Sequence, residues 1–336
     1  MRIGFWPPVY GNWIMSDDPA LCDASFAYTC AAAQLAERLG FDTLLLAEHF
    51  INPLGASVDQ LDAWSTAAAL AAVTDRIEIL AAVKPGLRAP GVVAKMAANI
   101  DRISGGRFAV NLVSAWWPPE YEMLGAQALT HDGRYARAHE YISIIKGLWT
   151  QDDFSFKGAY YEVRNATIAP KPIQRPHPTI YAGGESEAGR DLAASVADVY
   201  LLNGRPLEEL APIIADLDRR AAERGRRLRY GIAGFVICRP TEAAAQAELE
   251  RLAGLKRGKV IGGDPATVMH KNSSAPALRV GINGGTAAGL VGTPAQIAQH
   301  MRRIAELGVE TFLLQFHPTL EELELFGEEV MPLLRS

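Results

Sequence analysis

Strand-like and helix-like segments alternate along almost the whole chain, and this alternation restricts the fold more than any other feature. The expected strands are short, nearly continuous apolar runs, at 2–6, 42–47, 77–82, 107–113, 179–183, 198–202, 230–237 and 310–316. The expected helices lie at 24–39, 60–73, 91–103, 134–149, 187–196, 206–223, 241–254, 294–306 and 319–333. Apolar strands that alternate with helices are typical of a parallel sheet covered by helices. Eight such units in 336 residues favour an α/β fold of the TIM type, a (β/α)₈ barrel, over an open sheet.

Two long connections interrupt the regular spacing of this expected single domain, residues 1–336. Residues 150–178 join a helix to a strand through Pro-rich and Lys-containing sequence, and residues 255–292 are rich in Gly, Ser and Ala. Connections of this length in a compact domain are usually functional, so we interpret both as insertions. The stretch "GINGGTAAG" has the small residues that suit a lid loop. The alternative for the second insertion is a segment without fixed structure.

Composition argues against several functional classes. The net charge is −5 and basic residues are not gathered into long blocks, which disfavours a nucleic-acid or membrane-surface partner. The sequence contains neither a run long and apolar enough to cross a membrane nor a secretory signal pattern, so we expect a cytoplasmic protein. Its three cysteines form no C-x-x-C pair, which argues against a disulfide framework or a zinc ribbon. We expect no metal site.

Several common catalytic motifs are missing from the sequence. No G-x-G-x-x-G follows an expected strand, and no G-x-x-x-x-G-K-[ST] occurs, so dinucleotide-binding and P-loop folds are not indicated. The stretch "GGESEAG" at 183–189 resembles a nucleophile elbow, but Ala188 stands where that motif needs glycine. We therefore disfavour a serine hydrolase.

An internal similarity places two histidines at equivalent points. "AERLGFDTLLLAEH" and "AELGVETFLLQFH" align on Gly40 and Gly308, and each continues through an apolar strand to a histidine nine residues later, His49 and His317. Both would lie at the C-terminal ends of barrel strands, where barrel active sites are built. The strands concerned would be the second and the eighth, on either side of the first. The alternative explanation is convergence on a common helix–strand junction.

A glycine-rich turn suggests a phosphate site. In "YAGGESEAGRDLA" a strand ends at Gly183 and Gly184, and a helix begins near Ser186, so backbone N–H groups and a helix N-terminus can face an anion. In "HDGRYARAHEYI", Arg134 and Tyr135 open another helix and can reach the same phosphate. The alternatives are an ordinary capped turn and a surface salt bridge.

A further stretch, "GRFAVNLVSAWWPPEYEMLG", ends a buried strand with unusual residues. Asn111 lies near the strand end, where its amide can bond the polar edge of a ring, and Trp116 can flank that ring or its substrate. Trp116 and Trp117 would also wall an apolar pocket that excludes water. The alternative, mainly for Trp117, is aromatic core packing under a loop. Together with the phosphate motifs, these residues indicate a mononucleotide whose ring system lies in the barrel mouth.

These motifs, taken in order, resemble the bacterial-luciferase-like family of flavin-dependent monooxygenases nearly end to end. The resemblance is carried by "LGFDTLLLAEHF", "SGGRFAVNLVSAWWPPEYEMLG", "HDGRYARAHEYI", "KPIQRPHPTIYAGGESEAGRDLAA" and "LVGTPAQIAQHMRRIAELGVETFLL". Within the family the chain is most similar to dimethylsulfone monooxygenases, then to alkanesulfonate and pyrimidine monooxygenases. The resemblance implies a TIM-like barrel with an insertion lid, FMN used as FMNH₂, O₂ as co-substrate and a separate NAD(P)H:flavin reductase. We expect a homodimer or homotetramer.

The resemblance also implies roles for individual residues. The catalytic candidates are His49, Asn111, Trp116 and His317. The flavin-binding candidates are Glu48, His49, Asn111, Glu120, Arg134, Tyr135, Gly183, Gly184 and Ser186. The substrate-binding candidates are Trp6, Trp13, Trp116, Asn203 and Phe235.

The same comparison bears on the charge of the substrate. Ala233, Phe235 and Asn283 stand where alkanesulfonate enzymes have an Arg, a His and a further Arg, and Ala82 replaces a Thr of the pyrimidine enzymes. A buried anion without fixed cations is costly, so we expect a small neutral substrate, unless Lys84 and Arg88 point inward. The alternatives are an alkanesulfonate or pyrimidine-type monooxygenase, a deazaflavin-dependent oxidoreductase and a non-catalytic flavin-binding paralogue.

Overall fold

A closed barrel of eight parallel strands forms the centre of the computed structural model, which describes residues 1–9, 11, 23–53, 55, 59–114, 117–255 and 280–335. The strands follow one another around the barrel in the order β1 (Arg2–Phe5), β12 (Val309–Gln315), β9 (Arg229–Phe235), β8 (Val199–Leu202), β7 (Thr179–Gly183), β4 (Phe108–Leu112), β3 (Glu78–Val83) and β2 (Thr43–Leu46). The predicted TIM-type barrel is confirmed. As predicted, β2 and β12 lie on either side of β1.

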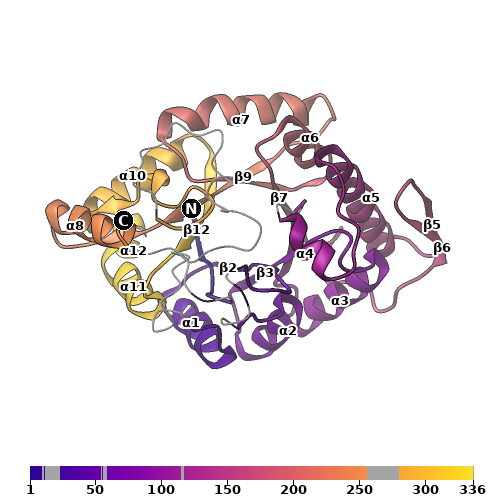
Figure 1. The fold of residues 1–336 in the computed structure, drawn as a ribbon, viewed down its shortest axis with the longest axis horizontal. Coiled ribbons are helices and arrows are strands. Elements are labelled where there is room, and N and C mark those ends of the chain that lie inside the picture. The colour runs from indigo at the N-terminus through magenta and orange to yellow at the C-terminus, as the bar shows by residue number, and fades with distance from the viewer. Residues whose placement is uncertain are drawn as a thin grey trace.

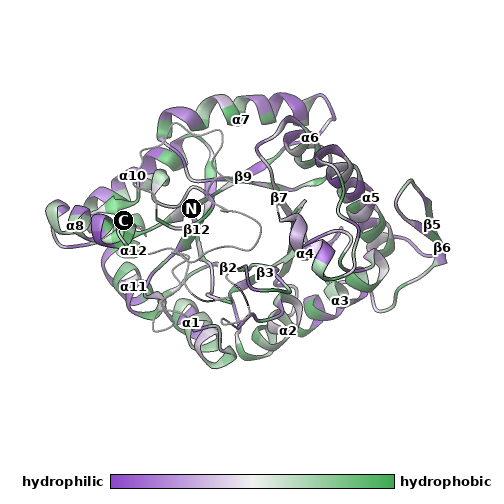
Figure 2. Ribbon diagram, viewed as in Figure 1, coloured by the Kyte–Doolittle hydropathy of each residue, from purple (hydrophilic) through white to green (hydrophobic). Residues whose placement is uncertain are grey.

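The helices form a ring around these strands (Figure 1). Each carries both hydrophobic and hydrophilic residues, as a helix between a core and solvent must (Figure 2). The ring consists of α1 (Phe26–Leu39), α2 (Ala63–Val73), α3 (Pro90–Ile103), α5 (His131–Thr150), α6 (Glu187–Val196), α7 (Leu207–Ala222), α8 (Glu242–Ala253), α10 (Pro294–Glu306), α11 (Thr319–Leu325) and α12 (Met331–Arg335). A π-helical turn, η3 (Phe326–Val330), joins α11 to α12, so the single helix expected at 319–333 is wrong in detail.

Six further elements lie outside the expected pattern. A short helix, α4 (Pro118–Met123), follows β4, and a 3₁₀ turn, η2 (Gly285–Ala288), lies in the second expected insertion. Strands β5 (Phe154–Lys157) and β6 (Glu162–Ala166) form a hairpin inside the first expected insertion, and it stands outside the ring beside α5 (Figure 1). Strands β10 (Ile237–Cys238) and β11 (Val291–Gly292) form a small parallel pair. Residues 256–279 of the second expected insertion lie outside the described residues.

The core fills the barrel and the layer between strands and helices. Phe5, Leu44, Leu80, Val110 and Leu313 are among its fully buried members. Among the helices that the structure describes, none is long and apolar enough to cross a membrane.

One carboxylate at the N-terminal end of the barrel strands joins α1 to β3. Glu37 accepts backbone N–H bonds from Asp75, Arg76 and Ile77, at 2.6–3.1 Å. Burial alone would raise the pKa of Glu37, but these N–H groups outweigh it and lower the pKa below 4.5. The ionised form therefore stabilises the fold.

We expect Glu37→Gln to lower the free energy of unfolding at neutral pH by about 1.5–3 kcal/mol, the range for hydrogen bonds to a charged group. Since the folded-state pKa is depressed, the wild-type advantage is present above the unfolded pKa and is lost as pH falls through the folded value. Denaturant titrations between pH 3 and pH 7 measure it. Glu306→Gln, at an exposed glutamate on α10, is the control. An advantage that persists at the lowest pH would contradict the assignment.

Candidate active site

The predicted site residues come from strand ends at one face of the barrel. Because all eight strands are parallel, their C-terminal ends meet at the same mouth, the face on which barrel enzymes build their sites. Several predicted residues end a strand or directly follow one, and so lie at this end of the barrel. They are Glu48 and His49 after β2, Lys84 after β3, Asn111 in β4, Gly184 after β7, Asn203 after β8, Phe235 at the end of β9 and His317 after β12.

A buried ionic cluster lies where β2, β3 and α4 meet; we call Glu48, His49, Lys84, Arg88 and Glu120 the Lys84 cluster. The Lys84 ammonium group lies 3.0 Å from His49 Nδ1 and forms a short ion pair with Glu120 Oε2. Glu120 Oε1 accepts a 2.8 Å hydrogen bond from the Phe50 backbone N–H. Lys84, Glu48, His49 and Glu120 are all buried. The sequence placed Glu48, His49 and Glu120 at the site but did not reveal that Lys84 joins them.

Arg88 occupies the outer side of the Lys84 cluster. Its Nε donates to Glu48 Oε1 at 3.0 Å, and its guanidinium group pairs with Asp62 and lies over the Phe50 ring, 4.7 Å from the centroid. Glu48 Oε2 also accepts a 2.6 Å hydrogen bond from the Lys84 backbone N–H. Lys84 and Arg88, the two cations that could have bound an anionic substrate, therefore both have carboxylate partners within the protein.

Burial shifts the pKa values of the acidic and basic groups of this cluster in opposite directions. It raises the pKa of Glu48 to about 7 although Lys84 and Arg88 oppose the shift, and it lowers the pKa of His49 to about 4, with Lys84 acting in the same direction. Burial also lowers the pKa of Lys84, against the attraction of Glu120. For Glu120, burial would raise the pKa, but the contacts with His49 and Lys84 lower it to about 2. His49 is therefore neutral at pH 7.

Asn111 faces the inside of the barrel. Phe108 packs edge-on against Trp64 of α2, with ring centroids 5.5 Å apart, so Phe108 points outward to the helices. Since side chains alternate along a strand, Asn111, three residues later, points inward. It pairs in register with Ala82 and Tyr181, and Asn111 is 8% exposed. Its amide is thus available to a group in the mouth.

The glycine turn after β7 has the tight packing of a phosphate-binding loop. Gly184 has a φ of 139°, and a Cβ on it would lie 3.1 Å from the Tyr135 hydroxyl oxygen. A Cβ on Gly189 would lie 2.8 Å from the Gly184 carbonyl. Ser186 is the N-cap of α6, and its hydroxyl accepts from the Gly189 N–H at 3.2 Å. The structure brings Tyr135, Gly184 and Ser186 together as predicted.

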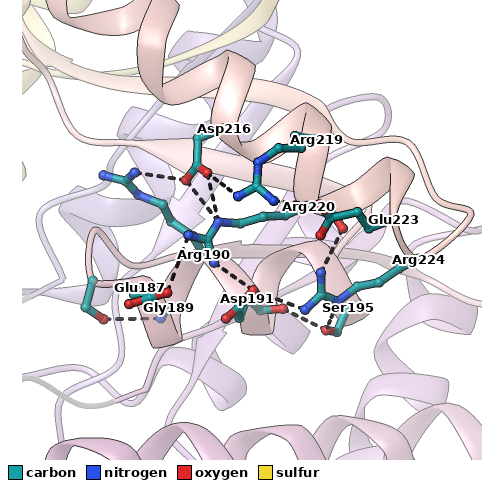
Figure 3. Close-up of polar contacts among 11 residues, drawn as sticks. Glu187, Gly189, Arg190, Asp191, Ser195, Asp216, Arg219, Arg220, Glu223 and Arg224 are labelled. Carbon is teal, nitrogen blue, oxygen red and sulfur yellow. Dashed lines mark hydrogen bonds and ion pairs between the residues drawn. The ribbon is translucent and has the colours of Figure 1, made fainter.

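Helix α6, whose N-terminus forms part of this turn, is held by ion pairs with α7 (Figure 3). Arg190 of α6 pairs with Asp216 of α7 at 3.0 Å, and Arg220 of α7 pairs with Asp191 of α6 at 2.8 Å. Individual exposed pairs contribute little, but a network that shares Asp216 and Arg220 restricts how α6 can move. The direction of the helix N-terminus is thereby fixed.

Arg205 and Arg134 have different surroundings. Arg205, which follows β8, is buried and pairs with Glu185 inside the turn and with Glu209. Arg134 lines a small hollow with Pro118, Tyr121 and Arg137, between α4 and the start of α5. The sequence did not indicate Arg205, because its partner Glu185 lies 20 residues earlier in the chain, in another segment.

The remaining predicted residues have varied surroundings. Trp13 and Trp116 lie outside the described residues, so their predicted roles stay predictions. Trp6 is buried, and Trp117 packs edge-on against His49 with centroids 5.9 Å apart. Phe235 has no exposed surface because Gly281 packs against it.

His317 has different neighbours from His49. The charged groups that influence it are Arg251 and Glu248 of α8 and Glu321, and burial lowers its pKa. The two histidines thus occupy equivalent strand ends in unlike electrostatic environments.

The chain matches known proteins over its whole length. A model of the luciferase-like monooxygenase family matches residues 1–311. The chain is 36% identical over 348 residues to an FMNH(2)-dependent dimethylsulfone monooxygenase from Pseudomonas putida, covering 100% of this chain and 96% of the relative. It is 35% identical to the enzyme of the same name from Pseudomonas fluorescens (strain Pf0-1), covering 100% and 95%.

Solved structures agree on the architecture. The long-chain alkane monooxygenase LadA superposes with a TM-score of 0.81 at 22% identity, covering 100% of this chain and 91% of that one. At this identity the likeness supports the fold alone. The family model and the full-length relatives confirm the predicted family: the chain belongs to the luciferase-like monooxygenases.

Proposed function

We propose that this chain is a two-component, FMNH₂-dependent monooxygenase that uses O₂ to oxidise and cleave a C–S bond, or another C–heteroatom bond, of a small neutral molecule such as dimethyl sulfone. That it is a flavin-dependent monooxygenase follows from its family and from relatives that are named as FMNH₂-dependent. The substrate, the site residues and the reductase partner are our proposal.

The glycine turn supports FMN as the cofactor. Gly184 and Gly189 allow the end of β7 to pack closely on the start of α6, whose N-terminus is capped by Ser186, and the Tyr135 hydroxyl lies beside Gly184. Such a turn suits a terminal phosphate. With the phosphate held there, the ring system would extend into the mouth toward Asn111. The flavin, when bound and reduced, supplies the electrons that activate O₂.

The charges of the mouth support a neutral substrate, and this observation carries the proposal. Lys84 and Arg88 are already paired with Glu120, Glu48 and Asp62. An anionic substrate would have to compete with these carboxylates, of which Glu48 and Glu120 are buried, for its counter-ions. Ala233 and Phe235 of β9 are buried apolar residues, so this strand end brings no charge to the mouth. A small uncharged sulfone meets no such cost.

The activity is tested by supplying reduced FMN, O₂ and candidate substrates, and following the products by mass spectrometry. We expect cleavage of dimethyl sulfone when a flavin reductase and NADH are included, and none with NADH and FMN alone, because the reductase is a separate protein. Rapid flavin reduction without the reductase would contradict the two-component assignment. A deazaflavin bound much more tightly than FMNH₂ would favour the hydride-transfer alternative.

The phosphate assignment predicts that Gly189→Ala weakens FMN binding although alanine favours helices. The added Cβ meets the Gly184 backbone at 2.8 Å, so the turn must shift. Losing one hydrogen bond to a charged phosphate corresponds to at least about tenfold in Kd.

Gly91→Ala on α3 is the matched control, because its new Cβ meets nothing closer than 3.8 Å. Flavin fluorescence titration measures both variants, with circular dichroism to show that they are folded. Equal FMN affinity in a folded Gly189→Ala variant would place the phosphate elsewhere.

The substrate assignment predicts that, among substrates of nearly the same size, the enzyme prefers uncharged molecules to anions. We expect methanesulfonamide and dimethyl sulfone to give a higher kcat/KM than methanesulfonate, because desolvating an anion beside buried carboxylates costs several kcal/mol. Competition assays with product detection measure the ratio. Faster turnover of methanesulfonate than of methanesulfonamide would overturn the neutral-substrate assignment and leave the flavin assignment standing.

A further inference from the structure

The Lys84 side chain dictates where its neighbour His49 carries its proton. A lysine ammonium group has three N–H donors and no lone pair. Its Nζ lies 3.0 Å from His49 Nδ1 and in short contact with Glu120 Oε2. Since Nζ can only donate, Nδ1 must accept. The single proton of the neutral imidazole ring is therefore on Nε2.

Glu120 favours the opposite tautomer. Its Oε1 lies 3.4 Å from the same Nδ1, and a carboxylate can only accept, so Glu120 acting alone would place the proton on Nδ1. Such a carboxylate–histidine pair leaves Nε2 as a base. In this structure Lys84 lies closer to Nδ1 than Glu120 does, and Glu120 Oε1 already accepts from the Phe50 N–H at 2.8 Å.

We propose that Lys84 is a positioning residue that holds His49 as the Nε2–H tautomer, so that His49 offers a hydrogen-bond donor rather than a base. Without Lys84 the same His49 and Glu120 would form a base dyad. The tautomer itself does not depend on flavin. Only the consequence for catalysis, that His49 donates to a bound group in the mouth, rests on the proposed function.

The surrounding charges support an ionised Lys84. Glu120 on α4 faces it directly, and Glu48, which follows β2, is the next carboxylate that acts on it. Arg88 is turned toward Glu48 and Asp62, and the Tyr121 hydroxyl of α4 donates to the Pro85 carbonyl. The ammonium group thus lies between carboxylates, and Glu120 remains ionised throughout the neutral range.

The test is ¹⁵N NMR of the flavin-free protein with labelled histidine rings, with the His49 signals assigned by their loss in His49→Gln. In the wild type between pH 5 and pH 8 we expect a pyrrole-type Nε2 and a pyridine-type Nδ1. In Lys84→Met we expect the reverse pattern, and a His49 pKa that rises from about 4 toward the ordinary 6.5. Lys84→Arg keeps a cation and should keep the Nε2–H tautomer.

Lys146→Met is the matched control. Lys146 is another largely buried lysine, on α5, where it donates to the Val196 carbonyl at 2.6 Å, and its loss should leave the His49 signals unchanged. A wild-type Nδ1–H tautomer, or an unchanged tautomer in Lys84→Met, would overturn the proposal. Either result would leave the activity test of the proposed function unaffected.

A second measurement needs no variant, which matters if Lys84→Met does not fold. A neutral amine has a lone pair, so the constraint on Nδ1 ends when Lys84 loses its proton. The wild-type tautomer should become mixed as pH rises through the pKa of Lys84, which burial holds below 10.5. A tautomer that stays unmixed through the titration of Lys84 would also overturn the proposal.

Discussion

The buried ion pair between Lys84 and Glu120 is the contact on which the arrangement of the mouth depends. It joins the end of β3 to α4, and through His49 and the Phe50 N–H it also fixes the segment after β2. Burying such a pair is expensive, so its value lies in geometry more than in stability. Removing either partner would leave the other charge in the core. The end of β2, the end of β3 and α4 are therefore positioned as a unit.

This arrangement separates two electrostatic regions within one barrel mouth. At β2 and β3 the cations are paired with carboxylates, and the end of β9 has the buried apolar residues Ala233 and Phe235 in place of charged ones. At β7 the backbone N–H groups and the start of α6 present positive potential, and the α6–α7 ion pairs hold that helix in place. One side suits an anionic cofactor group, and the other suits a reacting molecule without charge.

The barrel was predictable because fully buried parallel strands are continuous apolar runs, and all eight were found with ends off by one or two residues. Helix α4 was not among the expected helices, because adjacent prolines such as Pro118 and Pro119 break a helix interior. They occupy the first helical positions, where a missing N–H costs nothing. The β5–β6 hairpin was missed because its strands are short and alternate half-buried apolar residues with exposed polar ones, whereas the expected strands were continuous apolar runs. Candidate residues at strand ends were identifiable, but the pairing of Lys84 with Glu120 depends on three-dimensional proximity that spacing does not encode.

The pairing of β1 with β12 has a consequence for how the protein folds. Arg2 lies in register with Thr311, so the first strand finds one of its two neighbours only near the end of the chain. Until β12 has been synthesised, β1 presents an open edge that can pair wrongly with other chains. Closing the barrel also requires contacts between residues at opposite ends of the sequence, and such long-range contacts slow folding. The last strand thus completes the sheet and removes its exposed edge in the same step.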